Sequence, residues 1–491
     1  MMPFSVLHIS DLHRSPQDPI SNEELISALV SDRDRYTRED PAIPAPEAIV
    51  VSGDIIRGVG LGAAGYEAAL ASQYEVAAAF LDELVRRFLG GDRSRVVIVP
   101  GNHDVDWNTA FAAMTPVEEK DIPPNLEDAL FRESSEFRWN WKTRTLYRIT
   151  DPALYERRLA AFWQFFHSFY DGVPGLLKVQ VGADANLFSL CDGRIGVAGF
   201  NSCHGNDCFE RRGMVRKEAV ARSHLELSDT GALFDLRMGV WHHSIDGPPH
   251  RTDYMDVDVV RGMIGRGFRV GLYGHQHRTQ VAPHQVWLPD RERMAVVSAG
   301  SLCAGPRDLP TGTYRQYNIL EIAPDFLSVR VHVREMSVAN LFSRGTFPEF
   351  GGASVAELDW EPLRNPVGGR VNIGLRRRRA AIEEAEGLFK TGLSASAVAV
   401  LRPLDLPPGS YERDLFLNAA VAAVDWPAVL AVTNPPRSIQ ELVQRVDACT
   451  RTDDFGGALA SLDNFSAPLG MPPPLEAELR QRVAVIQGIK Q

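Results

Sequence analysis

Short polar motifs follow five apolar runs of this chain, and their order constrains the fold more than any other feature. The runs are short and rich in Val and Ile, which is typical of strands covered on both faces. Stretches with a helical pattern, at about 21–36 and 66–89, separate the first three runs. This alternation predicts an α/β layered fold with a largely parallel centre. The motifs are Asp11-Leu12-His13, Gly53-Asp54, Gly101-Asn102-His103-Asp104, His242-His243 and Gly274-His275-Gln276-His277.

The motifs supply the ligand types that bind a pair of divalent metal ions. In an open α/β sheet the carboxyl ends of the strands line one crevice, so residues far apart in sequence converge there. A carboxylate can bridge two ions, and Asp54 is the candidate; the side-chain oxygen of Asn102 is a neutral ligand. Imidazoles suit Mn, Fe, Zn or Ni. Two ions about 3.5–4 Å apart make a bridging water hydroxide-like, so that it attacks phosphorus, and His103 is placed to protonate the leaving oxygen.

The ordered motifs resemble those of the calcineurin-like metallophosphoesterases over residues 4–335, apart from an insertion. The resemblance implies a four-layer α/β/β/α sandwich with two divalent ions, of which Mn is expected to serve in vitro. It makes His103 the catalytic histidine and Asp104 a supporting residue, with His243 as an alternative ligand to His242. By the family pattern one ion is held by Asp11, His13, Asp54 and His277, and the other by Asp54, Asn102, His242 and His275.

The last residue of the third motif indicates which branch of the family the chain resembles. It is Asp104 rather than Glu, which resembles the cyclic-nucleotide phosphodiesterase and nuclease branches more than the Ser/Thr protein phosphatases. Those phosphatases also carry Gly-Asp-x-x-Asp-Arg, whereas this chain reads Gly53-Asp54-Ile55-Ile56-Arg57-Gly58. The second Asp is missing and the Arg is one place early. Arg57 is therefore either a substrate contact or simply a surface residue.

Pattern changes divide the rest of the chain. Residues 1–341 are expected to form the metallophosphoesterase domain, interrupted at 105–184 by an aromatic-rich helical insertion. Helical spacing of these aromatics indicates a packing face, and a lid that selects substrate is the other interpretation. Gly, Pro and polar residues predict a linker at 342–374. Residues 375–491 read as an all-α domain that loosely resembles a tetratricopeptide array, a kind of module that usually binds proteins.

Composition excludes some classes of function. A formal net charge of -11 argues against non-specific coating of nucleic acid or anionic membrane. The chain has no apolar run long enough for a transmembrane helix and no signal-peptide pattern. Five cysteines are sparse for 491 residues, which fits reduced thiols. We therefore expect a cytoplasmic protein.

These observations predict a metal-dependent phosphoesterase that hydrolyses phosphodiester or phosphomonoester bonds of a nucleotide or nucleic acid through a metal-bridging hydroxide. We also expect a larger assembly, with a protein partner bound through 375–491. One alternative is a metal-dependent nuclease subunit acting on DNA or RNA. Another is a catalytically weak scaffold that uses its C-terminal helical domain, against which the intact motifs argue.

Overall fold

The computed structural model divides the chain into two compact units. The first comprises Met1–Thr346 and Ser354–Pro366, and the second comprises Phe347–Ala353 and Val367–Gln491. The residues that the structure describes are 3–132, 135–230, 234–245, 253–285, 292–305, 308–310, 312–336, 340–360, 373–404, 406–408, 410–465 and 473–490.

One sheet of the first unit contains the strands that precede the first three motifs. Its described strands are β1 (Phe4–Ile9), β2 (Ala48–Val51), β3 (Val96–Ile98), β13 (Gln316–Ile322), β14 (Ser328–Met336), β15 (Phe342–Arg344) and β16 (Val355–Asp359). The order is β15-β14-β13-β1-β2-β3, with β16 paired to β14. β1, β2 and β3 run parallel, so the three motifs emerge at the same edge of the sheet. β15 and β16 lie within 342–374, and both pair antiparallel with β14.

A second sheet contains the strands that precede the last two motifs. Its described strands are β7 (Ala185–Leu190), β8 (Ile195–Phe200), β9 (Leu236–Val240), β10 (Val270–Tyr273), β11 (Gln280–Gln285) and β12 (Arg293–Ser298). The order is β11-β12-β10-β9-β8-β7. β8, β9, β10 and β12 run parallel, which brings the ends of β9 and β10 side by side.

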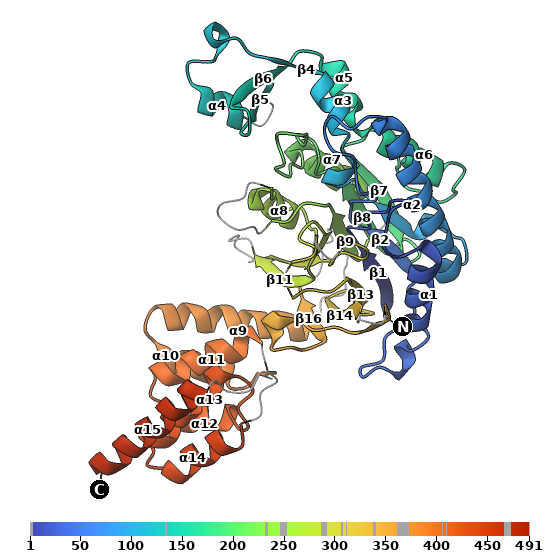
Figure 1. The fold of residues 1–491 in the computed structure, drawn as a ribbon. Coiled ribbons are helices and arrows are strands. Elements are labelled where there is room, and N and C mark those ends of the chain that lie inside the picture. The colour runs from blue at the N-terminus through green and yellow to red at the C-terminus, as the bar shows by residue number, and fades with distance from the viewer. Residues whose placement is uncertain are drawn as a thin grey trace. The chain divides into compact units, whose positions relative to one another are not determined.

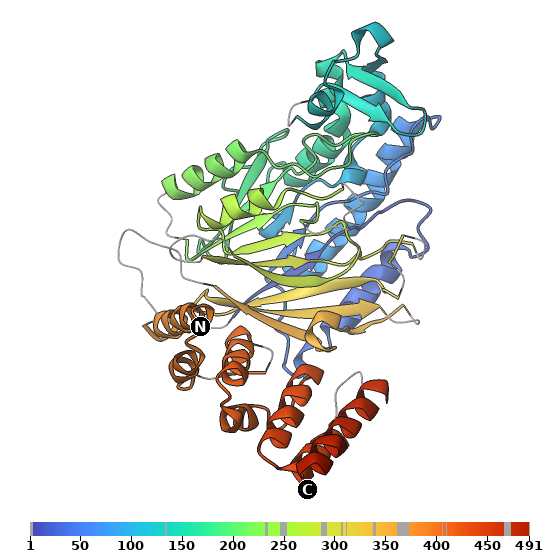
Figure 2. The same cartoon turned by 90° about the vertical axis from the view of Figure 1, so that its left-hand side faces the viewer.

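Helices cover the outer faces of the two sheets. α1 (Asn22–Arg33) and α2 (Tyr66–Leu89) lie along the first sheet, whereas α7 (Lys217–Asp229) and α8 (Val257–Ile264) lie along the second (Figure 1). Figure 2 shows the two sheets stacked between these helices. Ser21 caps α1 by accepting a hydrogen bond from the backbone of Glu24, as its sequence predicts. The first unit is therefore the expected α/β sandwich.

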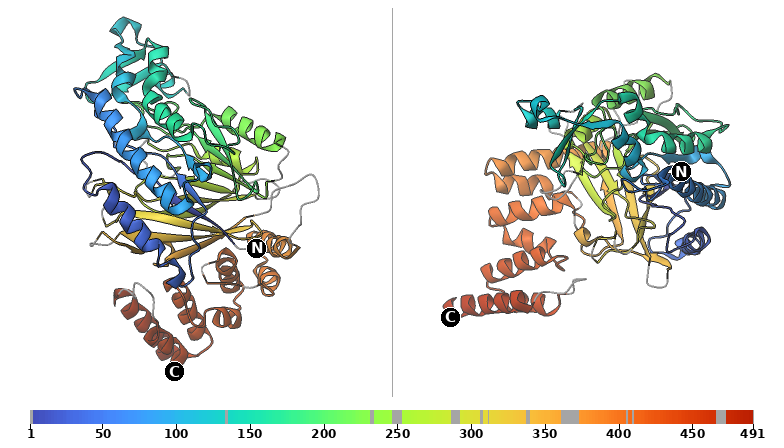
Figure 3. Two further views of the ribbon diagram at one scale, coloured as in Figure 1. Left: turned by 90° about the vertical axis from the view of Figure 1, so that its right-hand side faces the viewer. Right: turned by 45° about the horizontal axis from the view of Figure 1, so that its top comes forward.

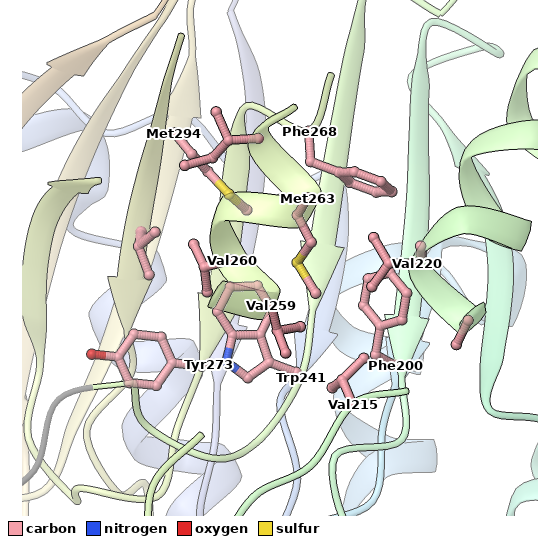
Figure 4. Packing of buried hydrophobic residues seen from close by; sticks show 14 of the residues in the cluster. Phe200, Val215, Val220, Trp241, Val259, Val260, Met263, Phe268, Tyr273 and Met294 are labelled. Atoms are coloured by element: carbon pink, nitrogen blue, oxygen red, sulfur yellow. The ribbon is translucent and has the colours of Figure 1, made fainter. Parts of the chain in front are cut away.

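The core of the second sheet is continuous with the helices that cover it. Trp241 and Tyr273, which follow β9 and end β10, stack with ring centroids 6.0 Å apart. Val260 and Met263 of α8 pack in the same buried cluster (Figure 4). Because Trp241 immediately precedes His242, this packing fixes the backbone from which the fourth motif projects.

The insertion contains helices, as expected, and also a small sheet. Its helices are α3 (Trp107–Ala112), α4 (Leu126–Phe131), α5 (Pro152–Glu156) and α6 (Ala160–Tyr170). Three short strands, β4 (Met114–Pro116), β5 (Phe137–Asn140) and β6 (Thr145–Ile149), form an antiparallel sheet. The aromatic face of α6 is buried; Phe165 stacks on Tyr74 of α2. These aromatics confirm the packing interpretation, and the lid stays a prediction.

The part of the second unit described from residue 373 onward is helical. Its helices are α9 (Ile373–Lys390), α10 (Ser394–Leu401), α11 (Tyr411–Ala422), α12 (Trp426–Val432), α13 (Ile439–Arg451), α14 (Phe455–Asp463) and α15 (Pro473–Lys490). Each packs against the next along the chain, as the right-hand view of Figure 3 shows. A buried ion pair between Arg413 and Glu441 joins α11 to α13. No described helix of either unit has the length and apolar character needed to span a bilayer.

Candidate metal centre

The first of two ligand clusters joins the loops after β1, β2 and β10. One ligand atom from each of its four residues lies within 4.8 Å of the others: Asp11, His13, Asp54 and His277. The Nε2 atoms of His13 and His277 are 3.0 Å apart. His277 Nε2 also lies 3.2 Å from an Asp11 oxygen, and His13 Nε2 lies 3.8 Å from an Asp54 oxygen. Two imidazole nitrogens and two carboxylates thus face one point.

The second cluster shares Asp54 and adds residues that follow β3, β9 and β10. The side-chain oxygen of Asn102 lies 3.0 Å from His242 Nε2 and 2.8 Å from His275 Nδ1. His242 Nε2 is also 3.3 Å from Asp54 Oδ2. All four residues expected to hold the second ion therefore converge, and Asp54 lies between the two clusters.

The chemistry of these donors fits divalent metal ions. Burial alone would raise the pKa of Asp54, but His242 and His103 hold it well below its usual value. Burial would lower the pKa of His242, yet the Asp54 carboxylate raises it to about 9; Asp11 does the same for His277. Ionised carboxylates therefore already attract positive charge at both clusters. Hard oxygen ligands with imidazoles are the donor set of Mn, Fe or Zn.

Most of the ligand residues have a left-handed backbone, which L-residues adopt rarely. Asp11, His13 and Asp54 have φ of 49°, 45° and 52°, and His275 and His277 have φ of 75° and 53°. Such strain costs about 1–3 kcal/mol at each position and persists where the surrounding structure imposes it. It gathers here at residues that direct side chains into the two clusters.

Two motif glycines permit the close approach of the loops. A Cβ on Gly101 would lie 2.1 Å from Asp54 Oδ1, and one on Gly274 would lie 2.6 Å from Asp11 Oδ2 and nearer still to Ser10. Gly101 has an ordinary φ of -116°. At Gly101 the requirement is thus for space rather than for backbone freedom.

His103 lies at the edge of the first cluster. Its ring packs edge-on against His13, with centroids 4.5 Å apart, and its backbone N–H donates to Asp54 Oδ1 over 2.8 Å. Its Nδ1 is 2.6 Å from the Arg57 carbonyl. A carbonyl can only accept, so Nδ1 carries the proton and Nε2 is free to exchange one with substrate.

Asp104 points into the protein rather than toward the ring of His103. Its Oδ2 accepts from the backbone of Gly101 at 2.8 Å and of Ile55 at 3.2 Å, and its Oδ1 accepts from the Tyr74 hydroxyl at 3.0 Å. Burial and the nearby Asp54 raise the pKa of Asp104 to about 7. These bonds hold the second and third motifs together, and a supporting role of Asp104 in catalysis stays a prediction.

The two remaining candidates lie outside the clusters. His243 is buried, and its ring nitrogens face Ser202 Oγ at 2.9 Å and Asn206 Nδ2 at 3.3 Å. The side chain of Arg57 is exposed, while its backbone carbonyl accepts a hydrogen bond from His103 Nδ1.

Sequence reasoning did not find Ser202, although its hydroxyl accepts from the backbone N–H of His242. Ser202 follows β8, so the rule that polar residues gather at strand ends could have identified it. Asp253 was also missed; its Oδ2 lies 3.8 Å from His275 Nε2.

Comparison with known proteins agrees with this geometry. A sequence model of the family described as calcineurin-like phosphoesterase matches residues 4–279. The chain belongs to this family. It is thus a metal-dependent phosphoesterase with a candidate site at Asp11, His13, Asp54 and His277.

Solved structures similar to this phosphoesterase are distant in sequence. One is a dimetal phosphatase from Danio rerio, at 11% identity, with 74% of this chain and 100% of that chain covered and a TM-score of 0.39. Another is PhoD, at 10% identity, with 76% and 73% covered and a TM-score of 0.42. A third is a 5'-nucleotidase from Candida albicans, at 11% identity, with 69% and 52% covered and a TM-score of 0.36. No curated protein matches the chain.

Proposed function

We propose that this phosphoesterase hydrolyses a phosphodiester of a nucleotide or nucleic acid, with two divalent ions held around Asp54. The observation that carries the proposal is the sharing of Asp54 by two clusters, because a carboxylate between two donor sets is suited to bridge two cations. The first cluster would use Asp11, His13 and His277, and the second would use Asn102, His242 and His275. The ions, when bound, would supply an activated water and neutralise phosphoryl charge.

The residues of the chain have separate tasks in this proposal. The carboxylates and imidazoles fix where the phosphoryl group lies. His103 lies at the edge of the first cluster. The Arg57 carbonyl holds one proton on its Nδ1, which leaves Nε2 for the substrate. In its protonated form this nitrogen donates a proton to the leaving oxygen as the P–O bond breaks. Asp104 and Gly101 keep the second and third motifs at the required separation.

Hydrolysis of bis-p-nitrophenyl phosphate by the full chain tests the proposal directly. Activity should appear with Mn²⁺ and disappear in Asp54→Ala. Asp34→Ala is a matched control, because this carboxylate is 63% exposed at the end of α1 and pairs with neighbouring Arg33. A wild-type protein inert with Mn²⁺, Fe²⁺, Ni²⁺ and Zn²⁺ would contradict the proposal. If the protein is active, a panel of cyclic nucleotides, DNA, RNA and phosphopeptides would identify the substrate class.

The Asp104 ending of the third motif supports a phosphodiesterase or nuclease over a Ser/Thr phosphatase. A nuclease acting on DNA or RNA within a larger assembly is the second candidate. The acidic net charge of -11 weighs against a duplex-DNA substrate, whose groove needs Lys and Arg. Preferential cleavage of DNA or RNA over cyclic nucleotides in the panel would favour this candidate.

We also propose that the helical second unit binds a protein partner. Its consecutive packed helices support this, as does the exposure of Val485 and Ile489 one turn apart on α15. Truncation after Trp360 should leave the generic activity intact, because Trp360 packs in the first unit and donates to the Phe326 carbonyl. Loss of activity in a folded truncation would instead show that the second unit shapes the site.

A further inference from the structure

Two histidines of the centre, His242 and His277, are held through the ring nitrogen that faces away from it. His242 Nδ1 lies 2.8 Å from the Ser52 carbonyl, and His277 Nδ1 lies 2.6 Å from the Asp308 carbonyl. Because a carbonyl only accepts, each contact keeps a proton on Nδ1, so in the neutral imidazole that binds a metal ion the Nε2 lone pair is directed at a cluster. Both imidazoles are thus oriented by neutral backbone groups.

His275 has the opposite orientation. Its Nδ1 faces the second cluster, 2.8 Å from the Asn102 side-chain oxygen. Its Nε2 faces a carboxylate instead of a carbonyl, with Asp253 Oδ2 at 3.8 Å. For Nδ1 to present a lone pair, the proton must be on Nε2, where it faces the negative charge of the carboxylate; the 3.8 Å separation is an ion-pair distance and is longer than a direct hydrogen bond.

A backbone hydrogen bond anchors the main chain two residues after Asp253. Met255 donates its backbone N–H to the Ser244 carbonyl over 2.6 Å, which ties this segment to the residues that follow His242. Met255 is itself buried, and α8 starts two residues later. The Asp253 side chain is 23% exposed and the His275 side chain 10% exposed, so the pair is largely shielded from water.

We propose that Asp253 is a positioning residue that fixes His275 as an Nδ1 ligand of the second metal ion. This inference rests on the proposed two-metal function and adds a residue that the motifs do not contain. The negative charge of Asp253 attracts the Nε2–H group, which favours the tautomer whose Nδ1 lone pair faces the second cluster. Loss of such an outer partner typically weakens metal affinity by about 10–100-fold.

The proposal predicts that the two clusters respond differently to the same change. Asp253 lies beside His275, which belongs to the second cluster. Removing it should therefore weaken the binding of one ion and spare the other. A merely structural residue would affect both ions together, along with the stability of the metal-free protein.

Mn²⁺ titration of the metal-free full chain by isothermal calorimetry separates these outcomes. We expect two equivalents for the wild type, and in Asp253→Ala about 10–100-fold weaker binding of one equivalent with the other unchanged. Asp253→Asn keeps an oxygen atom at this position without the negative charge, so its affinity for that Mn²⁺ equivalent should lie between those of the wild type and Asp253→Ala. Asp258→Asn, an exposed carboxylate on α8 paired with Arg261, is the matched control.

The possible contrary results are distinct. Two wild-type-like equivalents in Asp253→Ala would overturn the positioning role while leaving the two-metal proposal intact. Equal weakening of both equivalents, with a lower melting temperature of the metal-free protein, would assign Asp253 a structural role and also overturn it. A wild type that binds fewer than two Mn²⁺ ions would reject the proposed function itself, and this inference with it.

Discussion

Substitution of Gly101 by alanine tests whether activity depends on the spacing of the second and third motifs. The added Cβ would lie 2.1 Å from Asp54 Oδ1, whereas ordinary contacts of a Cβ begin at 3.4 Å. Either Asp54 or the third-motif loop must therefore move by roughly 1 Å. Because a misplacement of about 1 Å at a reacting centre can cost about 100-fold in rate, we expect kcat/KM for bis-p-nitrophenyl phosphate to fall by about that factor.

Gly60→Ala provides the matched comparison. A Cβ at Gly60 has no atom within 4 Å, and its φ lies outside the left-handed region, so the substitution should leave activity unchanged. Both variants should be folded, as judged by circular dichroism, and Mn²⁺ binding should weaken only in Gly101→Ala. A folded Gly101→Ala protein with kcat/KM within about threefold of wild type would refute the argument from space.

Two further predictions concern buried charge in the first unit. Asp207→Ala removes the carboxylate that pairs with the Arg138 side chain, which is only 8% exposed. The free energy of unfolding measured in urea should therefore fall by about 3–5 kcal/mol. A fall of less than about 1 kcal/mol would contradict a buried ion pair. Burial lowers the pKa of His8 to about 3 despite Asp11, so below pH 6.5 the unfolded chain binds a proton that the folded chain does not. Stability relative to His8→Gln should therefore fall by roughly 1 kcal/mol from pH 6.5 to 5.5, and a constant difference would exclude this linkage.

The convergence of the candidate ligand residues was predictable because each follows a short buried strand. Asp54 comes three residues after the end of β2, and His242 comes two after β9. Parallel pairing then forces the loops after neighbouring strands to the same edge. Local sequence therefore contained both the identity of these residues and the reason for their convergence.

Other features depend on contacts that no local pattern encodes. The small sheet of the insertion depends on pairing of β4 with β6, and Arg138 of β5 is held by Asp207 in the loop after β8. The inward direction of Asp104 depends on Tyr74 from another helix.

Anomalous diffraction from Mn²⁺-soaked crystals tests most directly the proposal that Asp54 bridges two metal ions. We expect two anomalous peaks about 3.5–4 Å apart, both in contact with Asp54. One should also contact Asp11, His13 and His277, and the other Asn102, His242 and His275. A single peak, or two peaks that do not share Asp54, would contradict the account.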